Sequence, residues 1–218
     1  MIFAVAGGKG GVGKSTVAYN LAAALSAVVV DGDLGMANLP ADRGPTLHDV
    51  LAGRADAREA LRAGPVTVLP CGRSLAGARA AEVSKLGEVL APVEREHGTV
   101  VIDCPAGLRA DVGAPLAVAD AVVIVAAPEP FALADALRTR ELARELDAPL
   151  AAVALNRVVD APPTPTVRSA LGAPVESVPA DPRLGRSIED EVPVVDAAPG
   201  SEPAAAFASL AACVDESR

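Results

Sequence analysis

Residues 7–16 read Gly-Gly-Lys-Gly-Gly-Val-Gly-Lys-Ser-Thr and match the pattern G-x-x-x-x-G-K-[ST] from Gly8 to Ser15. The stretch follows a strand-like segment at residues 2–6 and leads into an Ala- and Leu-rich segment of helical length. Glycines let backbone N–H groups turn inward around phosphate oxygens, and the helix that follows presents the positive end of its dipole. A merely flexible connection would not need a lysine followed by two hydroxyl residues. The stretch therefore predicts a phosphate-binding loop in the strand–loop–helix context that such a loop requires.

Each position of this loop has an expected contact with a nucleotide. Lys14 adds a full positive charge at the β and γ phosphates, and Ser15 supplies a hydroxyl for Mg²⁺. ATP or ADP with Mg²⁺ is therefore the expected cofactor. The loop residues expected to bind it are Gly8, Lys9, Gly10, Gly11, Val12, Gly13, Lys14, Ser15 and Thr16.

Two further strand-like segments end in carboxylates. Residues 28–33 read Val-Val-Val-Asp-Gly-Asp and carry Asp31 and Asp33, and residues 100–103 read Val-Val-Ile-Asp and end in Asp103. Ligands of open α/β sheets bind at the carboxyl edge of the strands. A carboxylate that ends a buried strand suits a Walker B element, which holds Mg²⁺ through water. An Asp-x-Asp pair after a strand is also a common turn, so by itself this pair leaves turn and site open.

The early lysine of the loop, Lys9, adds a more specific signal. Residues 9–16 follow the variant Lys-Gly-Gly-x-Gly-Lys-[ST]-Thr, and together with residues 28–39 and 100–107 they resemble the MinD/ParA family of deviant Walker ATPases, MinD-like proteins above all. The resemblance covers about the first 130 residues well. It implies an α/β fold of the P-loop NTPase type, with three layers, α/β/α, around a mainly parallel sheet of roughly seven to eight strands.

The resemblance also implies roles for individual residues. Asp33 would orient the attacking water, and Asp31 would lie near the Mg²⁺ shell. Lys9 would reach across a two-fold interface to the partner's nucleotide, so that ATP is sandwiched in a homodimer that hydrolysis dissolves. The implied catalytic residues of this slow, partner-stimulated Mg-ATPase are Lys9, Lys14 and Asp33, and the implied metal ligands are Ser15, Asp31 and Asp103.

In this family the activity drives a spatial switch that positions a cell-division, motility or partition assembly. One alternative is a metabolic ligase or kinase of the same fold, and another is an iron–sulfur carrier that bridges a cluster between two subunits. For the carrier, Cys104 would supply only two thiolates per dimer, and neither Cys71 nor Cys213 lies at a spacing that completes a site. Cluster binding is therefore the less favoured interpretation.

A weaker resemblance lies in the last third of the chain. Residues 155–157, Leu-Asn-Arg, and 178–181, Val-Pro-Ala-Asp, resemble the family's adenine-reading segments. Asn156 both donates and accepts, which suits an adenine edge, and Arg157 would stack on the base. Asn156 equally suits a turn at the end of a strand, and Pro179 with Asp181 equally suits the entry and N-cap of a helix.

Short β-branched runs alternate with helix-like stretches along the whole chain, which is the pattern of repeated βα units. Pro-rich residues 161–165 and 193–203 are interpreted as connections, so residues 1–218 are predicted to form a single P-loop ATPase domain. The expected strands are Ile2–Ala6, Ala27–Asp31, Val66–Pro70, Thr99–Asp103, Ala121–Ala126, Leu150–Leu155 and Pro174–Val178. The expected helices are Lys14–Ser26, Ala80–His97, Phe131–Leu146 and Glu202–Val214.

The charge balance limits the expected partners. The formal net charge is -9, from 28 acidic and 19 basic residues, and only Lys9, Lys14 and Lys85 are lysines. Such a surface opposes nucleic-acid binding, which depends on Lys and Arg at the phosphates. Residues 202–218 contain no lysine and show a modest apolar face, so direct membrane binding through a basic amphipathic helix is not favoured. The composition indicates a salt-adapted organism, although GC-biased codons alone give the same pattern.

Cysteine usage and hydropathy address the compartment. The three cysteines are odd in number and widely spaced, which indicates neither a disulfide framework nor a paired-cysteine metal site. No apolar run approaches the roughly 20 residues that span a bilayer. A cytoplasmic location is therefore expected, with any contact to a membrane or cell pole made through a partner.

Overall fold

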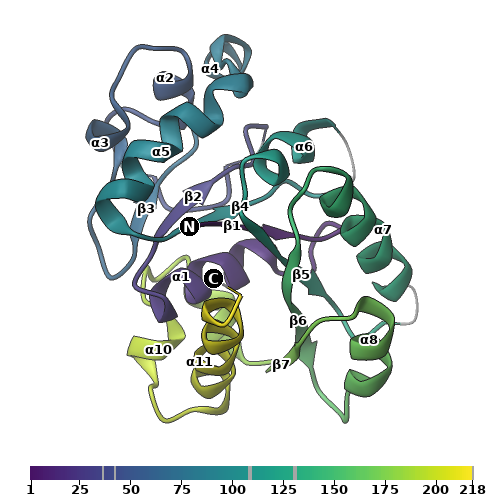
Figure 1. Ribbon diagram of the computed structural model, residues 1–218. Coiled ribbons are helices and arrows are strands. Elements are labelled where there is room, and N and C mark those ends of the chain that lie inside the picture. Colours follow the sequence, from purple (N-terminus) through teal and green to yellow (C-terminus); the bar gives the residue numbers. More distant parts are fainter. Residues whose placement is uncertain (36, 42, 108–109, 130–131, 218) are drawn as a thin grey trace.

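The computed structural model describes residues 1–35, 37–41, 43–107, 110–129 and 132–217, which build a seven-stranded sheet with helices on both sides (Figure 1). All strand pairs in the sheet are parallel, in the order β3-β2-β4-β1-β5-β6-β7. The predicted fold class is therefore confirmed. The strands are β1 (Ile2–Ala6), β2 (Val28–Asp31), β3 (Thr67–Leu69), β4 (Val100–Asp103), β5 (Ala121–Ala126), β6 (Leu150–Val158) and β7 (Val175–Pro179).

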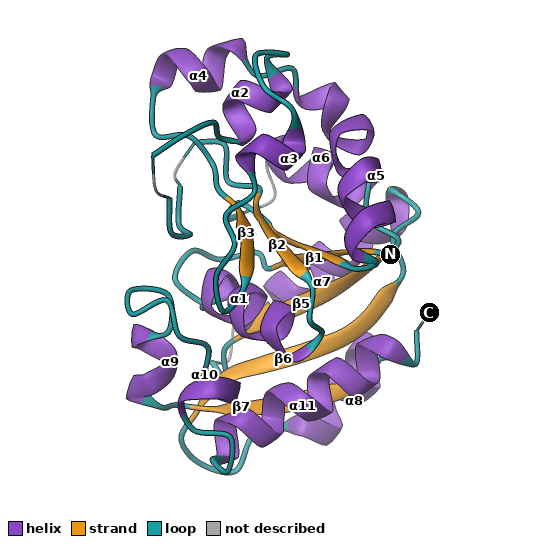
Figure 2. Cartoon of the chain, turned by 90° about the vertical axis from the view of Figure 1, so that its left-hand side faces the viewer, coloured by secondary structure: helices purple, strands orange, loops and turns teal. Residues whose placement is uncertain are grey.

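The helices form the two outer layers. They are α1 (Lys14–Ala24), α2 (Leu47–Leu51), α3 (Ala57–Ala60), α4 (Leu75–Ala80), α5 (Leu86–His97), α6 (Ala110–Ala117), α7 (Ala132–Glu145), α8 (Thr164–Leu171), α9 (Pro182–Arg186), α10 (Val194–Ala197) and α11 (Glu202–Asp215). Helices α1, α10 and α11 cover one face and α5 to α8 the other, with α2, α3 and α4 grouped beside α5 (Figures 1 and 2). Within the described residues, no helix is long and apolar enough to cross a membrane.

Strand β1 shows how the sequence places the two cores. Ile2, Ala4 and Ala6 enter the core on the side of α5 to α8, whereas Phe3 and Val5 enter the core with α1 and α11. A parallel strand that is covered on both faces reads as a continuous apolar run, and every residue of β1 is buried. Because β1 lies between β4 and β5, the loop that follows it sits at the middle of the carboxyl edge of the sheet.

Tertiary contacts change one predicted helix. The segment Ala80–His97 is not continuous, because a 3₁₀ turn spans Val83–Lys85 and α5 begins only at Leu86. The Glu82 N–H donates to Leu51 O of α2 at 3.1 Å, so a bond to another element stands where an intrahelical bond would be needed. Helical composition alone did not indicate this break.

The Pro-rich segments are more than connections, and that prediction is wrong. Helix α8 begins at Thr164 inside residues 161–165, and α10 lies inside residues 193–203. Pro165 falls in the first turn of α8 and Pro193 directly precedes α10. At these positions a helix does not need the missing N–H, so proline starts it rather than excludes it.

Smaller boundary shifts follow from local backbone conformation. Helix α1 ends at Ala24 rather than Ser26, whose φ of 52° is left-handed. Strand β6 continues past the predicted end at Leu155 to Val158 and so carries two predicted site residues within it. Phe131, the predicted first residue of the helix that became α7, lies outside the described residues.

Candidate functional site

The loop of residues 7–16 connects β1 to α1 at the carboxyl edge of the sheet. Gly11 and Gly13 have φ values of 80° and 94°, which L side chains rarely adopt. Gly13 is also the N-cap of α1, and its left-handed conformation directs the chain into the helix. Left-handed residues in such a loop turn successive N–H groups toward one side, as an anion cradle needs.

Lys14 is the buried charge of this loop. Its side chain is 7% exposed, and Nζ donates to Lys9 O at 3.3 Å. Burial lowers the pKa of Lys14 below its usual value, and nearby Asp103, Cys104 and Asp33 raise it in part. A desolvated ammonium group held on the carbonyl of its own loop gains most from an anionic ligand such as phosphate.

Asp103 ends β4 as a fully buried carboxylate, and neither of its oxygens has a hydrogen-bond partner within the described residues. Burial raises the pKa of Asp103 to about 8, which Ser15 and Lys14 partly counteract and Asp31 reinforces. Ser15 is thus close enough to influence this carboxyl group without meeting hydrogen-bond geometry. An orphaned carboxylate beside a hydroxyl is an all-oxygen donor set, which fits a hard cation such as Mg²⁺.

Asp31 is equally buried, but backbone groups use its oxygens. Oδ2 accepts from the N–H of Asn38 at 2.7 Å and of Leu39 at 3.0 Å, and Oδ1 accepts from the N–H of Asp33 at 3.3 Å. Burial raises the pKa of Asp31 to about 6, and these three bonds oppose the rise. The carboxylate therefore fixes the segment that carries Asp33, a role that sequence spacing did not indicate, while a place for Asp31 near the Mg²⁺ shell stays a prediction. We call residues 32–35 and 37–39 the switch segment.

We expect the magnesium-free protein to lose stability as the pH rises from about 4 to 8. An unfolded chain ionises Asp near pH 3.8, whereas folded Asp103 keeps its proton until its pKa of about 8. The folded state then binds more protons than the unfolded state, so a rising pH favours unfolding. Asp31 adds to this loss of stability only up to its pKa of about 6. The loss between about pH 6 and 8 is therefore due to Asp103.

Asp103→Asn should remove the slope between about pH 6 and 8 and raise the free energy of unfolding at pH 8 by about 1–3 kcal/mol. Urea unfolding with a metal chelator present, at several pH values, measures this. Asp160→Asn, at an exposed aspartate, is the matched control and should follow the wild type. A slope that persists in Asp103→Asn would contradict the assignment.

A cavity of about 500 Å³ opens beside the loop at the ends of β6 and β7. It is lined by Gly13, Thr16, Asn156, Arg157, Val159, Pro179, Ala180, Asp181, Pro182, Leu184 and Gly185. The structure thus brings the four residues of the predicted adenine site together. The sequence did not indicate Val159, which is 81% exposed, or Leu184 of α9. The volume and the partly apolar lining suit a nucleoside.

Asn156 and Arg157 are placed by an irregularity in β6. Asn156 is 4% exposed, and its Nδ2 donates to Val12 O of the phosphate loop at 2.8 Å. The pairing of β6 with β7 shifts register between Asn156 and Val158, and Arg157, with a φ of 62°, lies at this shift. Asn156 therefore binds the end of β6 to the phosphate loop, and Asn156 and Arg157 both line the cavity.

Asp181 has a structural role that the sequence had left open. It is the N-cap of α9, and its Oδ1 accepts from the Arg183 N–H at 2.8 Å. Arg183 also forms an ion pair with Asp181 at 2.5 Å, and these bonds lower the pKa of Asp181 to about 2. The alternative of a helix entry is thus confirmed, while base recognition by Asp181 stays a prediction.

Gly13→Ala should destabilise the protein by about 2–4 kcal/mol, from left-handed strain and a lost buried hydrogen bond. A Cβ at Gly13 would lie within van der Waals overlap of Asn156 Nδ2, so the bond to Val12 O must break. Gly10→Ala is the matched control, because a Cβ there meets Ala106 Cβ at an ordinary 3.8 Å. Urea unfolding distinguishes the two variants, and equal losses would argue against the contact.

Lys9 lies at the surface in an ion pair with Glu129. The Nζ to Oε2 distance is 3.1 Å, and the two side chains are 62% and 60% exposed. Exposed pairs of this kind contribute little to stability. The lysine is therefore available to another acceptor at small cost.

Cys104 is packed rather than presented to a ligand. Its side chain is 2% exposed, and Sγ donates to Ile102 O at 3.8 Å. Burial raises the pKa of this thiol above its usual value, which disfavours the thiolate that a metal or cluster would require. In the part of the chain that the structure describes, no three His, Cys, Asp or Glu side chains gather as a metal site.

Comparisons with known proteins agree with this geometry. Residues 1–142 match the sequence model of the AAA domain family AAA_31. An ATP-binding protein of Methanocaldococcus jannaschii is 40% identical over 171 residues, which cover 72% of this chain and 65% of that protein. A second ATP-binding protein of the same organism is 36% identical over 225 residues, which cover 96% of this chain and 85% of that protein.

The fold also matches a solved structure over nearly its whole length. The septum site-determining protein MinD of Pyrococcus horikoshii, complexed with Mg-ADP, superposes with a TM-score of 0.90 at 32% identity, covering 99% of this chain and 96% of that one. The matched AAA-domain region contains the phosphate loop, Asp33 and Asp103. The chain therefore belongs to the AAA domain family, and within it to the MinD/ParA group of P-loop ATPases.

Proposed function

We propose that this chain is an ATP-dependent dimerisation switch that positions a cellular assembly in cell division, motility or partition. Its cofactors are ATP or ADP and Mg²⁺. The observation that carries the proposal is the meeting of buried Lys14 with the orphaned carboxylate of Asp103 at one sheet edge, because each group gains from a phosphate and a cation bound together. The similar MinD from Pyrococcus horikoshii is a septum site-determining protein, which supports a positioning role here.

The chain's own residues then divide the work of ATP hydrolysis. Lys14 balances the charge of the β and γ phosphates, and bound Mg²⁺, held by Ser15 and Asp103, would neutralise the phosphate oxygens. Asp33 orients the attacking water from the switch segment, while Asp31 keeps that segment in place. The base would lie in the cavity that Asn156, Arg157, Pro179 and Asp181 help to line. Such a site works by positioning and electrostatics, and the resemblance to the MinD/ParA family implies slow turnover that a protein partner stimulates.

The dimer rests on Lys9 in this proposal. Its exposed ion pair with Glu129 leaves it able to reach the nucleotide of a second copy. Residues 1–218 act as one ATPase domain, because the sheet runs from β1 near the start to β7 and α11 packs on it. With a net charge of -9 the chain favours protein partners over nucleic acid and tolerance of high salt, and its cysteine usage favours a cytoplasmic location.

Lys9→Ala tests the dimer directly. With Mg-ATP, light scattering should give twice the monomer mass for the wild type and the monomer mass for Lys9→Ala, while both bind Mg-ADP with similar affinity. Lys85→Ala is the matched control, since Lys85 is also exposed and paired, with Glu82 at 3.0 Å. A wild type that stays monomeric with Mg-ATP would overturn the switch and put the metabolic ligase or kinase alternative ahead.

A further inference from the structure

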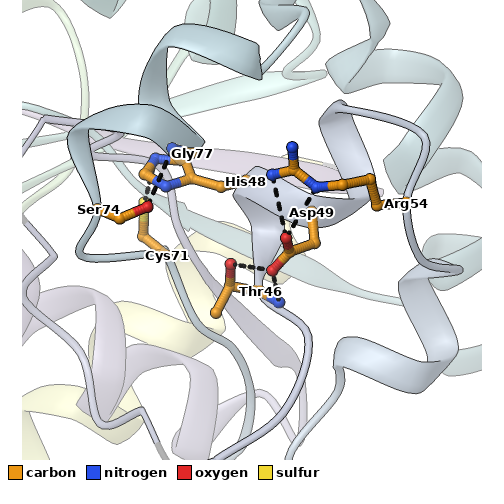
Figure 3. Close-up of polar contacts among 7 residues, drawn as sticks. All are labelled: Thr46, His48, Asp49, Arg54, Cys71, Ser74 and Gly77. Carbon is orange, nitrogen blue, oxygen red and sulfur yellow. Dashed lines mark hydrogen bonds and ion pairs between the residues drawn. The ribbon is translucent and has the colours of Figure 1, made fainter.

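A buried His–Cys pair lies next to the switch segment, and Figure 3 shows its two members, His48 and Cys71, side by side. His48 of α2 and Cys71, which follows β3, are 2% and 0% exposed. His48 Nε2 lies 3.0 Å from Leu34 O of the switch segment and 3.3 Å from Cys71 Sγ. One ring nitrogen therefore connects the switch segment to the neighbouring strand end.

The chemistry of these neighbours assigns the proton. A carbonyl oxygen can only accept, so Nε2 carries the hydrogen and donates to Leu34 O. In the neutral ring Nδ1 then carries the lone pair, and this atom is buried without a hydrogen-bond partner among the described residues. Backbone closes around it, because a Cβ at Gly72 would overlap Nδ1 and a Cβ at Gly77 would lie 2.9 Å from it. Close packing thus fixes the imidazole ring, and Nε2, the donor to Leu34 O, is its hydrogen-bonding nitrogen.

The short helix that carries His48 is fixed at its start. The N–H and the hydroxyl of Thr46 donate to Asp49 Oδ2 at 3.0 and 2.9 Å, and Arg54 Nε donates to Asp49 Oδ1 at 3.1 Å (Figure 3). The Leu47 N–H donates to Pro70 O at 2.8 Å, which joins α2 to the end of β3. This capping stabilises and orients a helix of only five residues, which would be unstable in isolation. His48 therefore approaches the switch segment from a rigid support.

The two attachments of the switch segment differ in kind. Asp31 holds it through three N–H bonds to a carboxylate, whereas His48 contributes one neutral bond that Cys71 Sγ can take over. If Leu34 moves, the buried Nε2–H keeps an acceptor, so this attachment is released without leaving an orphaned donor.

We propose that His48 is a positioning residue that holds the switch segment, and with it Asp33, through a releasable bond to Leu34. The proposal rests on the proposed function for the role of Asp33 in hydrolysis. The bond joins two groups of the protein itself, so it can be tested without turnover.

Three variants separate this role from simple packing. His48→Met keeps the bulk and removes the donor, His48→Gln returns a donor at the position of Nε2, and Cys71→Ala removes the second acceptor only. Hydrogen exchange of peptides covering residues 32–39 is measured on the nucleotide-free protein, with β6 peptides as a folding check. Single-turnover ATP hydrolysis and the Kd for Mg-ADP are measured in parallel.

We expect His48→Met to speed exchange of these peptides by about five- to tenfold, the loss of one hydrogen bond, and to slow hydrolysis while leaving the Kd for Mg-ADP within about twofold. His48→Gln should restore both values, and Cys71→Ala should slow exchange below the wild-type rate, because the released Nε2–H would then be buried without an acceptor. Exchange that is unchanged in His48→Met, or equally fast in His48→Gln, overturns the inference.

A wild type that hydrolyses no ATP counts against the proposed function instead, while the exchange result still decides the role of His48. If His48→Met does not fold, the same exchange measurement on His48→Gln and on the donor-free His48→Leu, each compared with the wild type, decides the role of His48.

Discussion

Lys14→Ala is expected to abolish nucleotide binding, with a loss of affinity for Mg-ADP of at least about 100-fold, or ~3 kcal/mol. The reason is that the protein itself buries Lys14 Nζ against Lys9 O, so folding rather than phosphate binding meets much of the cost of burying the charge. Titration calorimetry with Mg-ADP measures the loss.

The fold should survive this change, which separates a binding defect from unfolding. Because burial lowers the pKa of Lys14, the ammonium destabilises its own surroundings when no ligand is bound. Lys14→Met, which keeps most of the side-chain volume, should therefore unfold at the same urea concentration as the wild type or a higher one. A Lys14→Met protein that binds Mg-ADP normally would remove Lys14 from the site.

Asp33→Ala is expected to slow ATP hydrolysis by about 100-fold or more, the range lost with a group that positions or activates the attacking water. Binding should persist, since the phosphate loop and the cavity are untouched, so the protein should remain a dimer with Mg-ATP. Phosphate release and light scattering on the same sample measure both effects.

Asp33→Asn is the informative companion to this variant. The amide oxygen can still accept from the Gly35 N–H, which Asp33 Oδ1 accepts at 3.3 Å, so the backbone of the switch segment should hold its shape. If the charge orients the water, Asp33→Asn should be as slow as Asp33→Ala; if the turn alone matters, it should be close to the wild type. An Asp33→Ala protein that is monomeric with Mg-ATP would count against the trapped dimer.

The sequence predicts those parts of the site that are formed by residues adjacent along the chain. The phosphate loop was found because glycines, Lys14 and Ser15 must occur at fixed spacing between a strand and a helix. Asp103 was found because its strand is a continuous apolar run that ends in a charge. The alternation of such runs also gave the layers of the fold, since each parallel strand here is buried on both faces.

Other parts depend on contacts between distant residues and left no local signal. The bond from Asn156 to Val12 O joins β6 to the phosphate loop across the sheet, and no spacing rule indicates it. His48 stands in an unremarkable helical stretch, and its proximity to Leu34 and Cys71 appears only when β2, β3 and α2 are packed together. The sequence does not indicate α8 and α10 for a different reason, because proline breaks a helix in its interior but starts one at the positions of Pro165 and Pro193.

The place of β1 in the sheet also fixes when the site can exist during synthesis. Its neighbours are made much later, since Ile2 pairs with Val100 and Phe3 with Ala121. Until β5 has left the ribosome, the strand that leads into the phosphate loop has no partner on that side, and its apolar residues remain uncovered. Nascent chains that end before Ala121 should therefore not be retained on immobilised nucleotide, and protection of the first strand must come from chaperones or from the growing chain itself.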